Sequence, residues 1–300
     1  MSEDLFVTLP SGCRICYRVC GNPSDPAILL IGGNSCAMTQ KTGWLDERLS
    51  PPGHPHRVIR FDHRDTGLST SFPKPPEGAP PTYTLDDMVD DIVGLITHLQ
   101  LDRVHIVGMS MGGPLAWMAA SRLPNIAQSL ALIVTSPVGR IQDPTDNLPL
   151  MHTEAQVLLG EAYDPPENMD DDAGWINMYS KLDLALATQP PTEEERAESR
   201  RESEITYRRE KESGTMWTKT NHSAAAGVRW PRELLKKVRC PTVVIHAAKD
   251  QLFPLAHAEA LRDGVDGGTL VVVEDCGHEM PHRVRQLMAD AILANAKKGE

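Results

Sequence analysis

Three residues of the chain are of the types that together activate a hydroxyl group for attack on a carbonyl carbon. Ser110 is the central residue of "GMSMGG", a G-x-S-x-G pattern, while Asp250 ends "AAKD" and His278 ends "DCGH". A serine hydroxyl is a weak nucleophile until a base takes its proton, and a histidine base needs an acid to orient it. Serine, acid and histidine also follow in the chain order of hydrolases that carry the serine on a strand–turn–helix. The sequence therefore predicts nucleophilic acyl transfer.

Acyl transfer also needs hydrogen-bond donors for the charged oxygen of the tetrahedral intermediate. The backbone N–H of Met111, directly after the serine, is the first candidate. The second is expected from a loop after an early strand, and "LLIGGNS" fits this position. Gly33 is the candidate there because a residue without a side chain lets substrate approach its N–H. Asn34 is the neighbouring alternative.

The stretch "HEMPH", His278 to His282, also matches the H-E-x-x-H signature of zinc proteases. That signature binds metal when both histidines lie on one face of a continuous helix. Pro281 occupies its fourth position, and proline costs about 3 kcal/mol in a helix interior because it lacks an N–H and clashes with the preceding turn. We therefore expect a helix that begins near Pro281, with His278 in the loop before it. No metal site is predicted.

A parallel sheet would bring the three candidate residues together. Short apolar runs alternate with amphipathic stretches in residues 1–136 and again in 233–300, which is typical of βαβ units. Runs such as "AILLIGG", "RVHIVGM" and "TLVVVED" are almost continuously apolar, as strands buried on both faces must be. Ser110, Asp250 and His278 each follow such a run, so we expect them at one edge of the sheet.

Residues 137–232 interrupt this pattern with helix formers in place of β-branched runs. "TEEERAESRRESEITYRREKES" begins with Thr192 and Glu195 at the spacing of a capping box, and it predicts one long exposed helix. The simplest organisation is an α/β core made of residues 1–136 and 233–300, with residues 137–232 as a helical insertion. We call residues 137–232 the insertion.

Composition excludes several classes of partner. The net charge of −11 disfavours nucleic acid, because a phosphate backbone requires a cationic face. No apolar run is long enough to predict a membrane span. No secretory signal is evident at the N-terminus, so we expect a cytoplasmic protein whose six cysteines form no disulfides. The G-x-G-x-x-G pattern of dinucleotide-binding proteins is absent, and no cofactor is predicted.

With these motifs placed, the sequence resembles the α/β-hydrolase superfamily and, within it, the anthracycline methylesterases. The resemblance rests on "GGNS", "GW" at Gly43 and Trp44, "RFDHRDTGLST", "GMSMGG", "AAKDQLFP" and "CGHEMP". It covers most of the core, roughly residues 10–136 and 235–295, whereas the insertion matches poorly beyond being helical.

The resemblance implies a mostly parallel, doubly wound sheet of about eight strands with a helical cap over the active site. It implies a triad of Ser110, His278 and Asp250, with the N–H groups of Gly33 and Met111 as oxyanion donors and no metal or organic cofactor. The implied reaction is hydrolysis of a carboxylic ester, namely a methyl ester of a polycyclic polyketide. The partner is thus a hydrophobic small molecule, and the protein a monomer or homodimer. The candidate substrate-binding residues are Trp44, Trp175, Tyr179, Trp217, His222 and Phe253, although those in the insertion could equally form its own core.

Two other functions stay open on the same scaffold. The fold also carries lyases, carbon–carbon bond hydrolases and cofactor-independent ring-forming enzymes. A small-molecule receptor that keeps the shell without turnover is the other alternative. The intact set of serine, aspartate and histidine favours hydrolysis over both.

Overall fold

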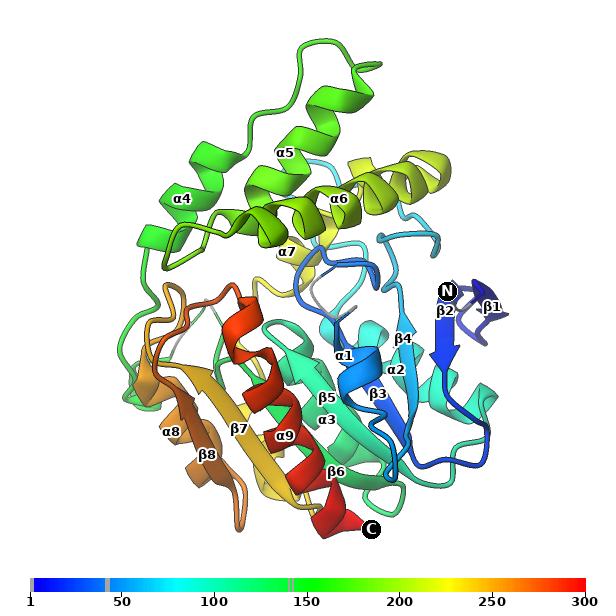
Figure 1. The fold of residues 1–300 in the computed structure, drawn as a ribbon, viewed down its shortest axis with the longest axis vertical. Coiled ribbons are helices and arrows are strands. Elements are labelled where there is room, and N and C mark those ends of the chain that lie inside the picture. Colours follow the sequence, from blue (N-terminus) through cyan, green and yellow to red (C-terminus); the bar gives the residue numbers. More distant parts are fainter. Residues whose placement is uncertain (1–2, 41–43, 140, 142) are drawn as a thin grey trace.

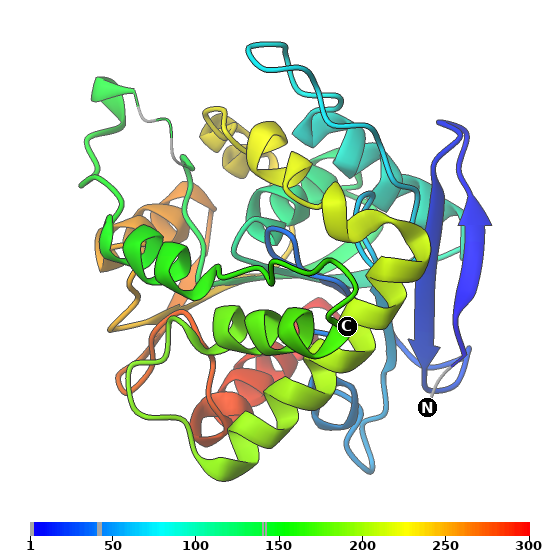
Figure 2. The same cartoon turned by 90° about the horizontal axis from the view of Figure 1, so that it is seen from above.

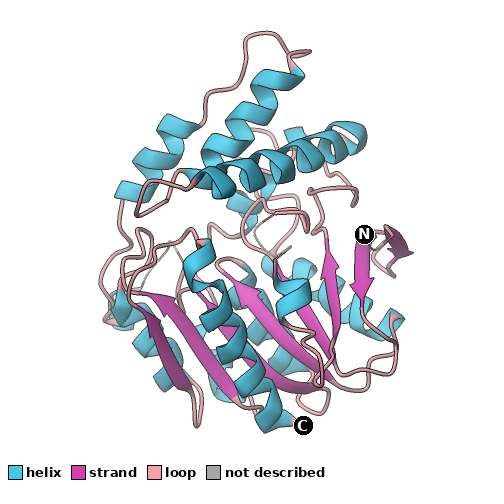
Figure 3. Ribbon diagram, viewed as in Figure 1, coloured by secondary structure: helices cyan, strands magenta, loops and turns pink. Residues whose placement is uncertain are grey.

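An eight-stranded sheet forms the centre of the computed structural model, which describes residues 3–40, 44–139, 141 and 143–300 (Figures 1 and 3). The strand order is β1-β2-β4-β3-β5-β6-β7-β8, and only the pairs β1–β2 and β2–β4 are antiparallel. The predicted doubly wound, mostly parallel sheet is confirmed. The strands are β1 (Leu5–Thr8), β2 (Arg14–Cys20), β3 (Ala27–Ile31), β4 (Arg57–Phe61), β5 (Val104–Met109), β6 (Ala127–Ile133), β7 (Thr242–Ala247) and β8 (Thr269–Val273).

Helices cover both faces of this sheet. Successive side chains of a strand point to opposite faces, so Leu29 and Ile31 of β3 pack into one apolar cluster while Ile28 and Leu30 pack into another. The first cluster includes α2, α3 and α8, and the second includes α1 and α9. The bounds of these helices are α1 (Leu45–Arg48), α2 (Leu85–His98), α3 (Gly112–Arg122), α8 (Leu255–Gly264) and α9 (His282–Gly299).

The insertion joins β6 to β7 and lies beyond the carboxyl ends of the parallel strands (Figure 1). Viewed from above, its helices lie in front of the core (Figure 2). Trp175, Met178 and Tyr207 belong to a separate apolar cluster, so this part has a small core of its own. The expected boundary at residue 232 falls at the start of the last 3-10 turn. The elements of this region are η1 (Pro144–Asp146), α4 (Glu154–Ala162), α5 (Asp172–Leu184), α6 (Glu193–Ser213), η2 (Thr215–Trp217) and α7 (Asn221–Ala225), and η3 (Arg232–Lys237) leads back into the core.

The long helix α6 begins where the sequence predicts. Thr192 accepts a hydrogen bond from the Glu195 N–H, and the Glu195 carboxylate accepts one from the Thr192 N–H. However, one face of the helix is buried, including Ser199, Ser203 and Thr206. These side chains are small and polar, so a search for apolar periodicity does not detect that they face inward.

The remaining expectations concern cysteines and membrane spans. All six cysteines are free. Cys13 and Cys16 are buried, and burial raises the pKa of both thiols to about 12, which makes them unreactive core residues. In the described part of the chain, no helix combines the length and apolar character that crossing a membrane requires.

Candidate active site

Ser110 occupies a sharp turn between β5 and α3. Its φ is 51°, in the left-handed region that residues other than glycine rarely adopt. A Cβ atom on Gly108 would lie 2.3 Å from the carbonyl oxygen of Gly112, and one on Gly112 would lie 2.3 Å from that of Ile31. Both contacts are far too short, so the two glycines are required sterically. The predicted strand–turn–helix context is confirmed.

The structure brings the three predicted residues into one hydrogen-bonded chain. The Nε2 atom of His278 lies 3.1 Å from Ser110 Oγ. Its Nδ1 atom lies 3.0 Å from Asp250 Oδ2 and 3.2 Å from Oδ1. Because an ionised carboxylate only accepts hydrogen bonds, Nδ1 carries the proton and Nε2 is free to accept from the serine hydroxyl. The arrangement can move a proton from Ser110 to His278.

Asp250 is buried at the end of β7. Its Oδ1 atom accepts hydrogen bonds from the N–H groups of Leu252 at 2.7 Å and Phe253 at 3.0 Å. Burial alone would raise the pKa of this carboxyl, but the nearby His278 and the backbone donors lower it overall. Asp250 is therefore held as an anion in one orientation.

Two neighbours of these residues fix the loop that carries His278. Gln251 accepts a hydrogen bond from the His278 N–H at 3.1 Å and donates to the carbonyl oxygen of Leu186 at 2.8 Å. Glu279 accepts from the Gly277 N–H at 2.9 Å and from the Thr188 hydroxyl at 2.6 Å. Since Leu186 and Thr188 belong to the insertion, the loop is tied to both parts of the chain.

The candidate oxyanion donors lie on either side of the serine. A Cβ atom built on Gly33 would lie 3.3 Å from Ser110 Cβ and 3.8 Å from Ser110 Oγ, so this residue faces Ser110. Among the described residues, neither the Gly33 N–H nor the Met111 N–H donates an intramolecular hydrogen bond. The side chain of Asn34 instead donates to Ser35 Oγ at 3.3 Å and Ser223 Oγ at 3.2 Å. Gly33 thus lies beside Ser110, and the choice between the Gly33 and Asn34 N–H groups as second donor stays a prediction.

The two histidines of "HEMPH" have separate surroundings. Helix α9 begins at His282, with Pro281 as its N-cap, while His278 lies in the preceding loop. The Nε2 atom of His282 pairs with Glu198 of α6 at 2.7 Å, whereas that of His278 faces Ser110. The predicted position of Pro281 is confirmed, and the helical zinc signature is not formed.

Two of the candidate substrate-binding residues belong to the core. The ring of Phe253 lies beside that of His278, with the two centroids 5.8 Å apart. Trp44 precedes α1 and is buried, and Gly43 before it lies outside the described residues. Phe253 is therefore the candidate that the structure places against the predicted triad.

Three of the four candidates of the insertion contact mainly the insertion itself, whereas His222 contacts loops of the core. Trp175 meets Trp217 edge to face at 5.4 Å, and Trp217 is 45 % exposed. Tyr179 is buried and donates to Glu210 at 2.7 Å. His222 is fully buried, and both of its ring nitrogens form hydrogen bonds. Nδ1 accepts from the Ser35 N–H in the loop after β3, and Nε2 donates to the carbonyl oxygen of Arg64 in the loop after β4. A role for these residues in binding substrate stays a prediction.

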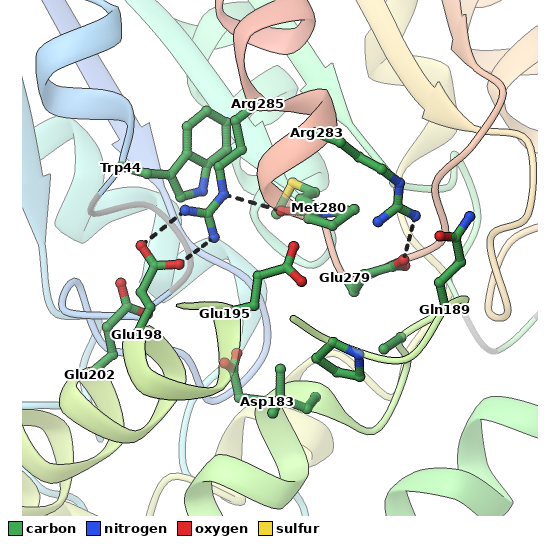
Figure 4. Close-up of a pocket in the computed structure, with 14 residues that line it drawn as sticks. Trp44, Asp183, Gln189, Glu195, Glu198, Glu202, Glu279, Met280, Arg283 and Arg285 are labelled. Atoms are coloured by element: carbon green, nitrogen blue, oxygen red, sulfur yellow. Dashed lines mark hydrogen bonds and ion pairs between the residues drawn. The ribbon is translucent and has the colours of Figure 1, made fainter. Parts of the chain in front are cut away.

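A pocket opens between the insertion and the start of α9, beside the loop of His278 (Figure 4). On one side, Arg285 forms a bidentate ion pair with Glu198, at 2.9 Å and 2.7 Å. Trp44 and Met280 line this pocket and also a smaller apolar cavity, which lies between the sheet and α1. The smaller cavity is further lined by Leu30, Ile31, Leu45, Val107, Met109 and Ile133.

One group of described residues offers three metal-ligating atoms within 4.8 Å of one another, namely His56, His105 and Glu300. His56 precedes β4 and His105 is the second residue of β5, so the group lies at the amino ends of the strands. From His105 to Ser110 the strand rises about 16 Å, at roughly 3.3 Å per residue. This group is therefore separate from the chemistry at Ser110.

Besides Gln251, sequence reasoning missed two polar residues, which contact the turn at Ser110 and the loop of Gly33. The hydroxyl of Thr135 donates to the Ser110 carbonyl oxygen at 2.7 Å, and His63 Nε2 lies 3.2 Å from the carbonyl oxygen of Gly32. Thr135 follows β6, which pairs with the strand before Ser110, and His63 follows β4, which pairs with the strand before Gly33. Their position after a strand is a signal available in the sequence, but their partners depend on how the loops fold.

Comparison with known proteins places this geometry in a family. The family model described as alpha/beta hydrolase fold matches residues 27–282. The chain is 27% identical to Rhodomycin D methylesterase DauP from Streptomyces sp. (strain C5), over 92% of this chain and 93% of that protein. It is 26% identical to 2-hydroxy-6-oxo-2,4-heptadienoate hydrolase from Pseudomonas putida, over 86% and 83% of the two chains.

A solved structure gives the same picture of the fold. The 2-hydroxy-6-oxo-6-phenylhexa-2,4-dienoate hydrolase of Rhodococcus sp. strain RHA1 is 20% identical and superposes with a TM-score of 0.73, covering 99% of this chain and 100% of that chain. The resemblance expected from the motifs is confirmed, since the family model spans most of the chain and a Rhodomycin D methylesterase is among its relatives. The chain belongs to the alpha/beta hydrolase fold family.

Proposed function

We propose that this chain is a serine esterase that hydrolyses a carboxylic ester of a hydrophobic small molecule. The observation that carries the proposal is the hydrogen-bonded chain from Ser110 through His278 to Asp250, with the serine on a strained turn. A hydroxyl hydrogen-bonded to a base, which is in turn hydrogen-bonded to an acid, performs acyl transfer on unrelated folds. We therefore assign the roles from this spatial arrangement.

Acylation begins at Ser110 Oγ. His278 Nε2 takes its proton as the oxygen attacks the ester carbonyl, and the N–H groups of Gly33 and Met111 stabilise the negative charge on the carbonyl oxygen. His278 then donates the proton to the departing alcohol. Asp250 keeps the Nδ1 proton in place and stabilises the imidazolium.

Deacylation repeats these steps with water as the nucleophile. His278 Nε2 takes a proton from water, the resulting oxygen attacks the acyl-serine, and the same two N–H groups stabilise the second oxyanion. Collapse returns the proton from His278 to Ser110 Oγ and releases the carboxylic acid. The cycle uses one ester and one water, and it requires no cofactor.

The substrate that we propose is a methyl ester of a polycyclic polyketide. Support comes from the relative named Rhodomycin D methylesterase, which the chain matches over almost its whole length. The pocket beside the loop of His278 is lined by Trp44 and Met280 and by seven charged side chains, and neither Ser110 nor His278 lines it, so the proposed substrate rests on the relative alone. We also propose that the insertion acts as a cap over Ser110 and His278.

Replacement of the nucleophile tests the proposal. Ser110→Ala should lower kcat on a p-nitrophenyl ester by at least about 10³-fold, because the remaining binding groups supply only part of the rate. Ser121→Ala is the matched control and should keep full activity, because Ser121 lies near the C-terminal end of α3, the helix that begins just after Ser110. Near-normal turnover by folded Ser110→Ala would exclude the nucleophilic role.

A carbon–carbon bond hydrolase is the second candidate, because another relative is named 2-hydroxy-6-oxo-2,4-heptadienoate hydrolase. The two functions differ in the bond that breaks. A panel of methyl esters, short acyl esters, lactones and that dienoate, each assayed with wild type and Ser110→Ala, separates them. Turnover of the dienoate that exceeds ester turnover would favour the second candidate.

A further inference from the structure

Two buried histidines contact the loop that carries the Gly33 N–H. This loop, residues 32–35, follows β3 and contains the oxyanion donor of the proposed mechanism. His63 comes from the loop after β4, and His222 comes from α7 of the insertion. Their rings meet edge to face with centroids 5.6 Å apart.

His63 contacts the peptide group that contains the donor. Its Nε2 atom lies 3.2 Å from the carbonyl oxygen of Gly32. A carbonyl oxygen is an acceptor, so Nε2 carries the proton and donates. The Gly32 carbonyl and the Gly33 N–H belong to one planar trans peptide and point in opposite directions. A hydrogen bond that holds the Gly32 oxygen therefore sets the direction of the Gly33 N–H.

His222 holds the other end of the loop. Its Nδ1 atom accepts a hydrogen bond from the Ser35 N–H at 3.0 Å, and its Nε2–H donates to the carbonyl oxygen of Arg64 at 2.7 Å. Ser35 has a φ of 57°, which a residue with a side chain keeps only when its surroundings enforce it. The Ser35 hydroxyl also donates to the Lys219 carbonyl oxygen at 2.8 Å. The left-handed turn is thus held by the insertion.

Both rings are suited to fixed hydrogen bonds. Burial lowers the pKa of His63 to about 3 and that of His222 to about 4, so each ring is neutral at pH 7. A neutral imidazole has one N–H and one acceptor nitrogen. His222 uses both, and its orientation is therefore fully determined by Ser35 and Arg64.

We infer that His63 and His222 are positioning residues for the oxyanion hole, and that His222 makes this alignment depend on α7 being docked on the core. His63 orients the peptide that contains the Gly33 N–H. His222 fixes the loop two residues later and packs against His63. The inference rests on the proposed function, because it assigns a purpose to the donor at Gly33.

Amide side chains can test each nitrogen separately. Asparagine places its amide near the position of imidazole Nδ1, and glutamine places its amide near that of Nε2. At position 222, His222→Asn keeps an acceptor for the Ser35 N–H, whereas His222→Gln keeps only the donor to Arg64. At position 63 the order reverses, because His63→Gln keeps the donor to Gly32 and His63→Asn does not reach it.

The inference predicts a crossed pattern of kcat values on an activated ester. His222→Gln and His63→Asn should lower kcat by about 10- to 100-fold, which is less than the loss of a whole oxyanion donor. His222→Asn and His63→Gln should stay within about threefold of wild type, and KM should change little in all four. Affinity for a trifluoromethyl ketone, which forms a tetrahedral adduct on serine, should fall in parallel with kcat.

Controls separate positioning from stability. His105 is a buried histidine at the opposite end of the sheet, so His105→Asn and His105→Gln should change the unfolding midpoint without changing kcat. Ser35→Gly separates the hydroxyl of this residue from its N–H. Glycine adopts φ near 57° freely and keeps the N–H that donates to His222, so this variant should stay within about threefold of wild-type kcat.

Equal kcat values for the Asn and Gln variants at each position would overturn the inference, as would losses of kcat that simply follow the unfolding midpoint. Ser110→Ala, assayed beside these variants, distinguishes a failure of the positioning role from a failure of the proposed esterase function. If Ser110→Ala is inactive while all histidine variants are fully active, the positioning role fails and the proposed esterase stands. If Ser110→Ala stays active, the proposed function itself fails.

Discussion

Asp250 shows at the scale of single residues how the backbone dictates chemistry. Its Oδ1 atom accepts from the Leu252 and Phe253 N–H groups, which leaves Oδ2 nearest to His278 Nδ1. In Asp250→Asn the amide oxygen would keep the two backbone bonds and the NH₂ group would face Nδ1. The imidazole would then carry its proton on Nε2 and could not accept one from Ser110. We expect kcat to fall by about 10⁴-fold, as for the same change in other serine hydrolases.

The measurement is kcat together with the unfolding midpoint of Asp250→Asn. A large loss of kcat with an almost unchanged midpoint supports the tautomer argument. An active variant would show that Asp250 is not the orienting acid.

The glycines of the turn give a second residue-scale prediction. A Cβ on Gly112 would lie 2.3 Å from the Ile31 carbonyl oxygen and 2.6 Å from that of Gly32. Backbone cannot move aside as a flexible side chain can, so Gly112→Ala should destabilise the chain by about 1–3 kcal/mol or more. Gly160→Ala, on α4 with nothing within 4 Å, is the control and should be neutral or stabilising by up to about 1 kcal/mol. Urea unfolding of both variants checks the contrast, which equal stabilities would refute.

The sequence predicts the candidate catalytic residues better than the residues that orient them through hydrogen bonds. Ser110, Asp250 and His278 each follow a strand, and parallel strands end at one edge, so their meeting could be expected. His63 and Gln251 form hydrogen bonds to the loops of Gly33 and His278, and the paths of these loops depend on tertiary packing. For that reason no spacing in the sequence indicates their partners.

At the scale of elements, helix α6 is joined to the sheet by an ion pair. Arg209 of α6 donates to Asp62, which follows β4, at 2.6 Å, and the Asp62 side chain has no exposed surface. Asp62 also accepts from the N–H groups of Met38 and Leu68. Arg209→Met would leave this carboxylate buried without its cation, and the expected loss is about 3–5 kcal/mol in the free energy of unfolding.

The neighbouring residue on the helix is the control for this prediction. Arg208 is 72 % exposed and pairs with Glu204 one turn away. Arg208→Met should change the free energy of unfolding by about 0.5 kcal/mol or less. Urea titration of both variants gives the comparison, and a small effect of Arg209→Met would show that the pair does not anchor the helix.

Elements were predictable where their pattern is apolar or capped. The start of α6 followed from Thr192 and Glu195, and the central strands followed from their apolar runs. Strand β1 did not, because only one of its four residues is buried. The inward face of α6 was also missed, since serine and threonine occupy positions that normally indicate burial only when apolar.

At the scale of the whole molecule, buried neutral histidines make stability depend on pH. Burial lowers the pKa of His63 to about 3 and that of His222 to about 4, and the positive charges of Arg64 and Lys219 act in the same direction on His222. In the unfolded chain both titrate near about 6.5. Between these values the unfolded chain binds protons that the folded chain does not. Stability is therefore expected to fall as pH drops from about 6.5 toward 4.

Urea unfolding at pH 7 and pH 5 measures this dependence. His222→Asn removes one of the titrating groups and should make the pH dependence shallower. An unchanged slope in His222→Asn would mean that other groups dominate the acid sensitivity.

The most direct test of the proposed mechanism is covalent labelling of the nucleophile. Wild type would be treated with a p-nitrophenyl alkylphosphonate, and the intact mass, the modified peptide and the residual activity would be followed together. We predict one phosphonyl group per chain, located on Ser110, with activity lost in proportion to labelling and no label on Ser110→Ala. Stoichiometric labelling of a different residue, or full ester turnover by a chain labelled on Ser110, would contradict the account.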